Sequence, residues 1–164
     1  MKLPIHTECM QVTSPLGPIQ LAVAGQSLVG VWFDGQAHQP DLSHHIQTSG
    51  HPVLQAAATQ LAQYFAGQLT HFDLPLNLTT GTAFQQTVWQ ALLGIGRGQT
   101  CSYKSLSARI GKPAAIRAVG GAVGRNPLSI ILPCHRVVGA NGALTGYAGG
   151  LARKTALLHL EGAL

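Results

Sequence analysis

Cys134 and His135 stand side by side in the stretch PCHRVVG, residues 133–139, directly after a proline. A cysteine thiolate is a nucleophile, and a histidine is the usual group that takes its proton. Neighbours on an extended chain point to opposite sides, so a third group or a water must complete such a site. The alternative is a small buried thiol followed by a surface His-Arg pair. Residues 128–132 are apolar and β-branched, which predicts a short buried strand ending at Cys134.

Glu161 is a candidate third group. Its spacing of four from Leu157 and three from Leu158 puts it on the apolar face of a helix predicted over residues 151–164. A carboxylate there needs a partner, and if that partner is His135, Glu161 orients the imidazole that draws the proton from Cys134. Only about 3% of a free thiol is ionised at neutral pH, so a lowered pKa is expected for Cys134.

Glu161 has an alternative partner. An ion pair with Lys154 or Arg153 on the last turn of the helix would also account for its position.

Charge is divided unevenly along the 164 residues. Up to Gly81 one lysine faces four acidic residues, a formal charge of −3, whereas from Thr82 nine basic residues face Glu161 alone, a formal charge of +8. An excess of this size attracts polyanions, with nucleic acid first among them. A basic surface kept for solubility is the alternative. The switch predicts two domains, residues 1–81 and 82–164.

Composition limits the other functional classes. Charged residues make up only 9% of the chain, yet its Gly and Ala content is that of a globular protein. There is no signal peptide and no long apolar run, so we expect a cytoplasmic protein without a membrane span. Cys9, Cys101 and Cys134 are far apart, and the histidines have no ligand spacing. We therefore expect no disulfide framework, no metal and no cofactor.

The first half alternates between apolar and polar residues over 19–33, with a turn at Gly25, and so predicts a β-hairpin. A helix is predicted over residues 52–68, with Leu54, Ala58, Leu61 and Phe65 on its buried face. The first half is therefore a small α/β unit.

The second half predicts helices over 82–95 and 102–111 and a third from Pro113 that stops before Asn126-Pro127, the last two forming a helix-turn-helix. The third helix carries Arg117 among small residues, and Gly120, Gly121 and Gly124 each cost roughly 1 kcal/mol relative to alanine. Close approach to a narrow DNA groove would explain them. Tight packing against another helix would explain them equally well.

PCHRVVG, with RAVGGAVGRNP before it and GYAGGLARKTALLHLEG after it, closely resembles the O6-alkylguanine-DNA alkyltransferase family. The likeness is continuous from Phe84 to Gly162 and weaker before that. It implies a ribonuclease H-like α/β first domain, with a small antiparallel sheet and a helix, and a mainly α second domain of the winged-helix or helix-turn-helix type.

The resemblance also implies a function: irreversible, single-use transfer of an alkyl group from O6 of guanine to Cys134, with O4 of thymine left open as a second target. The implied partner is duplex DNA carrying O6-alkylguanine. The protein would bind it as a monomer, with cooperative binding along the duplex left open.

Roles for individual residues follow from the same resemblance. The catalytic set is Cys134, His135, Glu161 and Asn126. Arg117 enters the duplex in place of the flipped nucleotide. The substrate-binding set is Tyr103, Arg117, Val137, Tyr147, Ala148 and Lys154. The DNA-binding set is Ala115, Ala118, Gly120, Arg125 and Arg136. Ala148 and Ile116 depart from the family pattern, which has serine in some relatives at the first position and commonly alanine at the second.

Two other classes compete with this one. A cysteine hydrolase would also use Cys134, His135 and Glu161, but water has no carbonyl to attack in an S-alkyl thioether. A helix-turn-helix regulator would not need Cys134, and it would want long polar side chains on the helix that carries Arg117.

Overall fold

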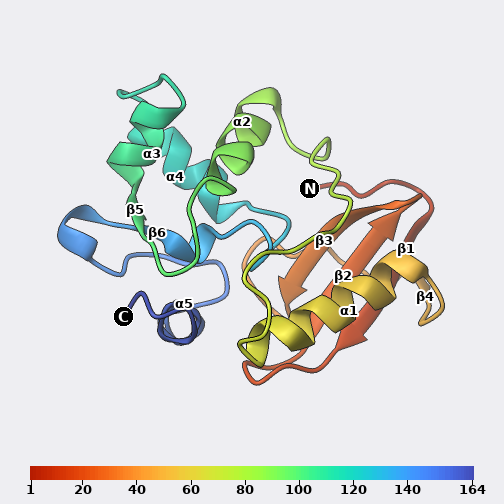
Figure 1. The fold of residues 1–164 in the computed structure, drawn as a ribbon. Helices are drawn as coiled ribbons and strands as arrows, with labels where there is room; N and C mark the ends of the chain where they lie inside the picture. Colours follow the sequence, from red (N-terminus) through yellow and green to blue (C-terminus); the bar gives the residue numbers. More distant parts are fainter.

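The computed structural model describes residues 1–164 and divides into a sheet-and-helix lobe and a helical lobe (Figure 1). The first lobe holds β1 (Thr7–Val12), β2 (Ile19–Ala24), β3 (Ser27–Phe33), β4 (Ile46–Gln47) and α1 (Pro52–Phe65). The second holds α2 (Ala83–Leu92), β5 (Cys101–Ser102), α3 (Tyr103–Arg109), α4 (Ile116–Gly124), β6 (Val137–Val138) and α5 (Leu151–Leu160). The expected α/β and mainly helical halves are confirmed.

The sheet of the first lobe has the strand order β3-β2-β1-β4. The predicted hairpin is β2 and β3, which turn at Gly25 with a φ of +59° that favours glycine. An antiparallel sheet was expected, but the sheet is mixed. The short β4 joins β1 in parallel through the pairs Glu8 with Ile46 and Cys9 with Gln47.

Helix α1 covers one face of this sheet (Figure 1). The side chain of His51 accepts a hydrogen bond from Val53 N–H at its N-terminus, and the chain leaves it at Gly67 with a φ of +74°. Its buried residues are Leu54, Ala57, Leu61 and Tyr64. The predicted face named Ala58 and Phe65 instead, and these two are only partly buried. Tyr64 is therefore turned inward, towards the second lobe.

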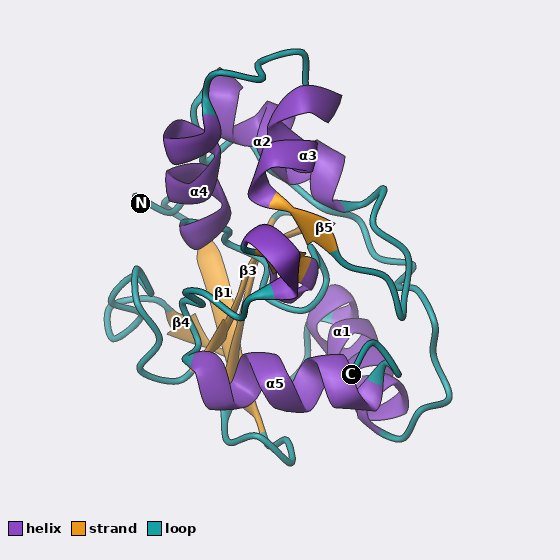
Figure 2. Cartoon of the chain, turned by 90° about the vertical axis from the view of Figure 1, so that its left-hand side faces the viewer, coloured by secondary structure: helices purple, strands orange, loops and turns teal.

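Three of the helices of the second lobe pack together, with α4 against both α2 and α3 (Figure 2). Thr82 caps α2 together with Gln85, each side chain bonding the other's backbone N–H. Helix α4 begins at Ile116 rather than at Pro113, because residues 113–115 form a turn. Strands β5 and β6 pair in parallel beneath these helices.

The strand predicted at residues 128–132 is wrong. Only Leu128 bridges to Val31, and the chain then turns twice. Ile131 N–H bonds Ser129 O around Ile130, whose φ of +73° is strained for a β-branched residue. Cys134 N–H bonds Leu132 O at 2.7 Å around Pro133, an inverse γ-turn with φ −78° and ψ 61°. The chain thus enters a 3₁₀ turn, Cys134–Arg136, instead of ending a strand.

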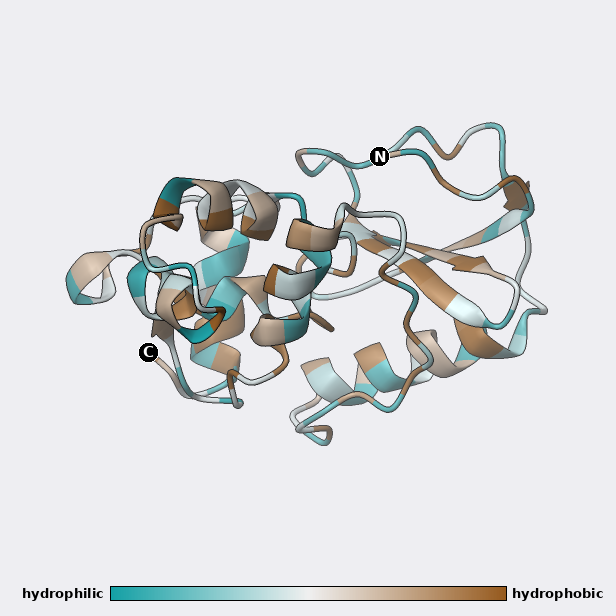
Figure 3. Ribbon diagram, turned by 90° about the horizontal axis from the view of Figure 1, so that it is seen from above, coloured by the Kyte–Doolittle hydropathy of each residue, from teal (hydrophilic) through white to brown (hydrophobic).

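Both lobes share one core. The same cluster of buried apolar side chains includes Val31 of the sheet, Leu61 of α1, Val88 of α2 and Leu157 of α5. The two lobes lie side by side, and apolar residues occur on the ribbons of both (Figure 3). The shared core fixes the orientation of the first lobe against the 3₁₀ turn. No helix combines the length and the apolar character needed to cross a membrane.

Candidate active site

Cys134 opens the 3₁₀ turn and lines a cavity of about 130 Å³. Helices α3 and α4 and residues 146–148 form its walls. The residues around the cavity are Tyr103, Gly120, Val123, Gly124, Cys134, Gly146, Tyr147 and Ala148. The cavity thus brings together five residues predicted from the sequence. Tyr103, Gly120, Tyr147 and Ala148 line it together with Cys134, which carries the sulfur.

Asn126 fixes the approach to this sulfur. Its Nδ2 donates to Leu132 O at 2.8 Å and to Cys134 Sγ at 3.0 Å, and its Oδ1 accepts from Leu128 N–H at 2.9 Å. The amide therefore ties together both ends of the double turn before Cys134. A buried side-chain network of this kind, with every group bonded, holds a unique backbone arrangement.

The thiol of Cys134 is not ionised in the free protein. Burial raises its pKa to about 11, and this outweighs the lowering by the hydrogen bond from Asn126 and by the charge of Lys154. The expectation of a lowered pKa is wrong, because Cys134 is 5% exposed and no cation contacts its sulfur. Activation must therefore remove the proton during the reaction.

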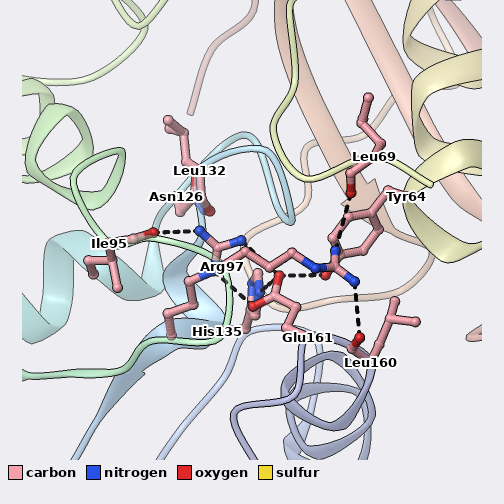
Figure 4. Close-up of polar contacts among 10 residues, drawn as sticks. Tyr64, Leu69, Ile95, Arg97, Asn126, Leu132, His135, Leu160 and Glu161 are labelled. Atoms are coloured by element: carbon pink, nitrogen blue, oxygen red, sulfur yellow. Dashed lines mark hydrogen bonds and ion pairs between the residues drawn. The ribbon is translucent and has the colours of Figure 1, made fainter. Parts of the chain in front are cut away.

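Glu161 is the buried partner of His135, as the first of its two sequence interpretations predicted. His135 Nε2 lies 2.9 Å from Glu161 Oε1 (Figure 4). Burial alone would raise the pKa of Glu161, but the hydrogen bonds from Arg136 and His135 lower it overall. The carboxylate stays charged, and the alternative ion pair with Lys154 or Arg153 is absent.

His135 is held neutral and in one orientation. Burial lowers its pKa, and the bond to Glu161 raises it by less. Because a carboxylate only accepts, Nε2 must carry the proton of the neutral ring, which leaves the lone pair on Nδ1. That Nδ1 is buried and has no partner within the protein. No direct hydrogen bond joins His135 to Cys134, so the neighbours do not form a pair by themselves.

Arg136 was expected to contact DNA, and its position contradicts this. The residue is 9% exposed, and its side-chain Nε and Nη2 donate to the two oxygens of Glu161 at 2.8 Å each. Its Nη1 donates to Ile95 O. A planar guanidinium fits a carboxylate in this two-pronged way, which explains why the sequence has arginine after His135.

Lys154 is fully buried and does not reach the cavity beside Cys134. Its Nζ donates to Val137 O at 2.6 Å, Thr145 O at 3.0 Å and Gly146 O at 3.1 Å. Burial lowers its pKa. Lys154 thus fastens β6 to the chain segment that forms one wall of the cavity, and it occupies the Val137 carbonyl that was expected to meet the base.

The exposed side of α4 carries Arg117 and Ala118, with the half-buried Ala115 before them and the exposed Arg125 after the helix. Packing inside the protein does not require its glycines. A methyl group at Gly124 would meet nothing within 4 Å, and at Gly120 and Gly121 it would make ordinary contacts at 3.8 and 3.6 Å. The explanation by tight packing against another helix is therefore wrong, and Gly120 and Gly124 line the cavity beside Cys134.

Comparison with known proteins agrees with this arrangement. Residues 83–163 match the model of the 6-O-methylguanine DNA methyltransferase DNA-binding domain, and residues 9–78 match that of the ribonuclease-like domain of the same proteins. The chain belongs to the 6-O-methylguanine DNA methyltransferase family.

Individual members of the methyltransferase family resemble the chain along most of its length. It is 50% identical over 150 residues to the methylated-DNA--protein-cysteine methyltransferase of Mycobacterium tuberculosis, covering 92% of this chain and 89% of that one. For the Haemophilus influenzae protein of the same name the identity is 44%, over 90% and 82% of the chains. The crystal structure of Mycobacterium tuberculosis OGT in complex with DNA superposes with a TM-score of 0.88 at 47% identity, covering 95% and 93%.

Sequence reasoning missed what the first lobe adds to this methyltransferase site. Tyr64 OH donates to Glu161 Oε1 at 2.8 Å, across 97 positions of the chain. Ala37 N–H bonds Ala148 O at 3.0 Å, and Ser129 Oγ bonds the buried Gln36. No local pattern marks these residues, because each acts through a neighbour that is distant in sequence.

The raised pKa of Cys134 predicts the pH dependence of its reaction with a small electrophile. The thiol stays protonated until the pH approaches about 11. Its alkylation by iodoacetamide, followed by peptide mass spectrometry, should therefore accelerate about tenfold per pH unit from neutral pH to about pH 10. A plateau near neutral pH would instead show a thiolate held by the protein.

Proposed function

We propose that this chain repairs DNA by transferring a methyl or larger alkyl group from O6 of guanine to Cys134. One observation carries the proposal: a buried thiol lines a cavity beside α4, and the next residue is a neutral histidine that Glu161 orients. Membership of the methyltransferase family agrees with that chemistry.

The reaction needs no cofactor. Sγ of Cys134 attacks the alkyl carbon, an S–C bond forms, and the bond from that carbon to O6 breaks. No direct hydrogen bond joins His135 to Cys134, so the thiol proton passes through a bridging water to Nδ1 of His135, the basic nitrogen, and Glu161 stabilises the imidazolium that results. The electron pair of the broken bond stays on O6, and the guanine anion takes up a proton as it leaves. The thioether product has no carbonyl for water to attack, so each molecule acts once.

A neutral thiol suits such a reaction. A free thiolate would react with any electrophile that entered the cavity, whereas the buried thiol loses its proton only as the S–C bond forms. The protein then works on a carbon that the cavity holds in line with Sγ. Positioning of this kind replaces permanent activation.

Duplex DNA is the proposed partner, bound through α4 and the positive charge of the second half. A helix face with small residues fits the narrow minor groove, where Ala115, Ala118 and Gly120 would meet sugars and phosphates. Arg117 would fill the space of the extruded nucleotide. Extrusion costs a few kcal/mol, and less for a base whose pairing an alkyl group has weakened.

The extruded base would enter the cavity between Tyr103 of α3 and the segment that carries Tyr147 and Ala148. Tyr103 would crowd the target phosphate, and the backbone N–H of Ala148 would replace the serine hydroxyl of some relatives. The carbonyl of Val137 has one lone pair left beside its bond to Lys154 and can still meet the base.

The proposed domain boundary lies between Gly81 and Thr82, where the charge changes sign and the cap of α2 begins.

The proposed place of action is the cytoplasm, a reducing compartment that suits the three free cysteines, Cys9, Cys101 and Cys134.

Transfer of the alkyl group is visible as a mass increase. Incubated with duplex DNA containing O6-methylguanine, the protein should gain one methyl group per molecule on Cys134, as intact and peptide mass spectrometry would show. Cys134→Ser is the matched control and should gain none. Continued product formation after one turnover would identify a hydrolase instead, and sequence-selective DNA binding without an adduct would identify a regulator.

Gly121 tests whether α4 enters a DNA groove. Gly121→Ala should stabilise the free protein by about 0.5–1 kcal/mol in thermal unfolding, because alanine is the better helix former and the added methyl makes only an ordinary contact. The same methyl should weaken binding to duplex DNA in a fluorescence anisotropy titration. Reaction with free O6-benzylguanine should stay unchanged. An unaltered affinity for duplex DNA would show that α4 is not part of the DNA-binding surface.

A further inference from the structure

Tyr64 links the first lobe to the catalytic carboxylate. It lies near the end of α1, is 1% exposed, and donates its hydroxyl proton to Glu161 Oε1 at 2.8 Å (Figure 4). Burial raises the pKa of Tyr64, as does the charge of Glu161, so its hydroxyl keeps the proton and always acts as the donor. The first lobe thus supplies a permanent hydrogen bond to the active site.

The bonds to Glu161 are distributed unevenly between its two oxygens. Oε1 accepts from Tyr64 OH, His135 Nε2 and Arg136 Nη2, at 2.8, 2.9 and 2.8 Å. Oε2 accepts from Arg136 Nε alone among these donors. Tyr64 therefore shares with His135 the one oxygen that orients the imidazole.

Packing holds Tyr64 in this position. The guanidinium of Arg97 lies over its ring at 5.4 Å and donates to Leu69 O at 3.2 Å and Leu160 O at 3.0 Å. The rings of Phe65 and Phe72 lie 5.3 and 5.5 Å from it. Arg97 thus joins the chain after α1 to the end of α5, directly beside Glu161 (Figure 4). A side chain locked in this way is a preorganised donor.

We propose that Tyr64 is a positioning residue for alkyl transfer, and that its hydroxyl sets how strongly Glu161 acts on His135. The inference rests on the proposed function. A donor on Oε1 takes up part of the carboxylate charge, which reduces the attraction between that oxygen and an imidazolium. Tyr64 thereby keeps His135 neutral, and so able to accept the thiol proton, at a lower pH than Glu161 alone would allow.

The charged groups around His135 come from two elements. Arg136 lies on the same 3₁₀ turn as Cys134, Glu161 lies at the end of α5, and Lys154 lies within α5. All of these belong to the second lobe. From the first lobe Tyr64 bonds Glu161, and Arg97 lies over the ring of Tyr64.

Removing the hydroxyl tests this role. In Tyr64→Phe the ring and its contacts remain, but Oε1 loses one donor, so the pKa of His135 should rise by about half a unit or more. His135 must be neutral to accept a proton. The acid limb of the rate of alkyl transfer from O6-benzylguanine should therefore move to higher pH by the same amount. The pKa is followed by the imidazole resonances of His135 in NMR.

The matched control is Leu54→Val, which trims the buried face of the same helix without touching Glu161. It should lower the melting temperature of the protein. The pKa of His135 and the midpoint of the acid limb of the alkyl-transfer rate should both stay unchanged. Adding Tyr64→Phe to a Glu161→Gln variant, where the charge is gone, should likewise move the pKa of His135 no further.

Contrary results are easily recognised. An unchanged pKa of His135 in Tyr64→Phe, a rate that falls by one factor at every pH, or an equal shift in the Glu161→Gln background would each overturn the role of Tyr64. If the wild-type protein accepts no alkyl group, the proposed function fails, whereas the NMR titration still decides on Tyr64.

Discussion

The buried carboxylate of Glu161 is the interaction on which the rest of the site depends. A charge without water is costly unless donors surround it, and here four hydrogen bonds from three side chains do so. Those donors come from α1 and from the 3₁₀ turn of Cys134, while Glu161 ends α5. One carboxylate therefore joins both lobes at the point where the chemistry takes place, and losing any donor would leave a buried charge poorly compensated.

This arrangement determines how the thiol is used. Glu161 fixes which nitrogen of His135 carries the proton, and burial keeps both the imidazole and Cys134 uncharged. The free protein therefore contains a neutral thiol as the acid and a neutral imidazole as the base, and not a thiolate–imidazolium ion pair. A nucleophile that is spent after one reaction benefits from this, because it is not consumed by stray electrophiles. In the proposed reaction, selectivity then comes from the cavity and from extrusion of the base.

Features carried by neighbouring residues were predictable from the sequence. The helix predicted from residue 82 is capped by Thr82, and the apolar spacing of Glu161 indicated a buried carboxylate that His135 could reach. Features that depend on distant partners were not. Residues 128–132 have the composition of a strand, but only Leu128 finds a strand to pair with. The burial of Arg136 and the raised pKa of Cys134 depend on residues that only the folded second lobe brings together, and the contact of Tyr64 with Glu161 depends on the packing of the two lobes.

The most direct test of the central claim is single-turnover alkyl transfer by Glu161→Gln, measured with O6-benzylguanine by intact mass against time. Glutamine keeps the shape of the side chain but removes the charge that stabilises the imidazolium of His135. The account predicts a folded protein whose rate falls by about 10²–10⁴, the usual contribution of general acid–base catalysis. A folded variant that transfers the alkyl group at the wild-type rate would contradict it.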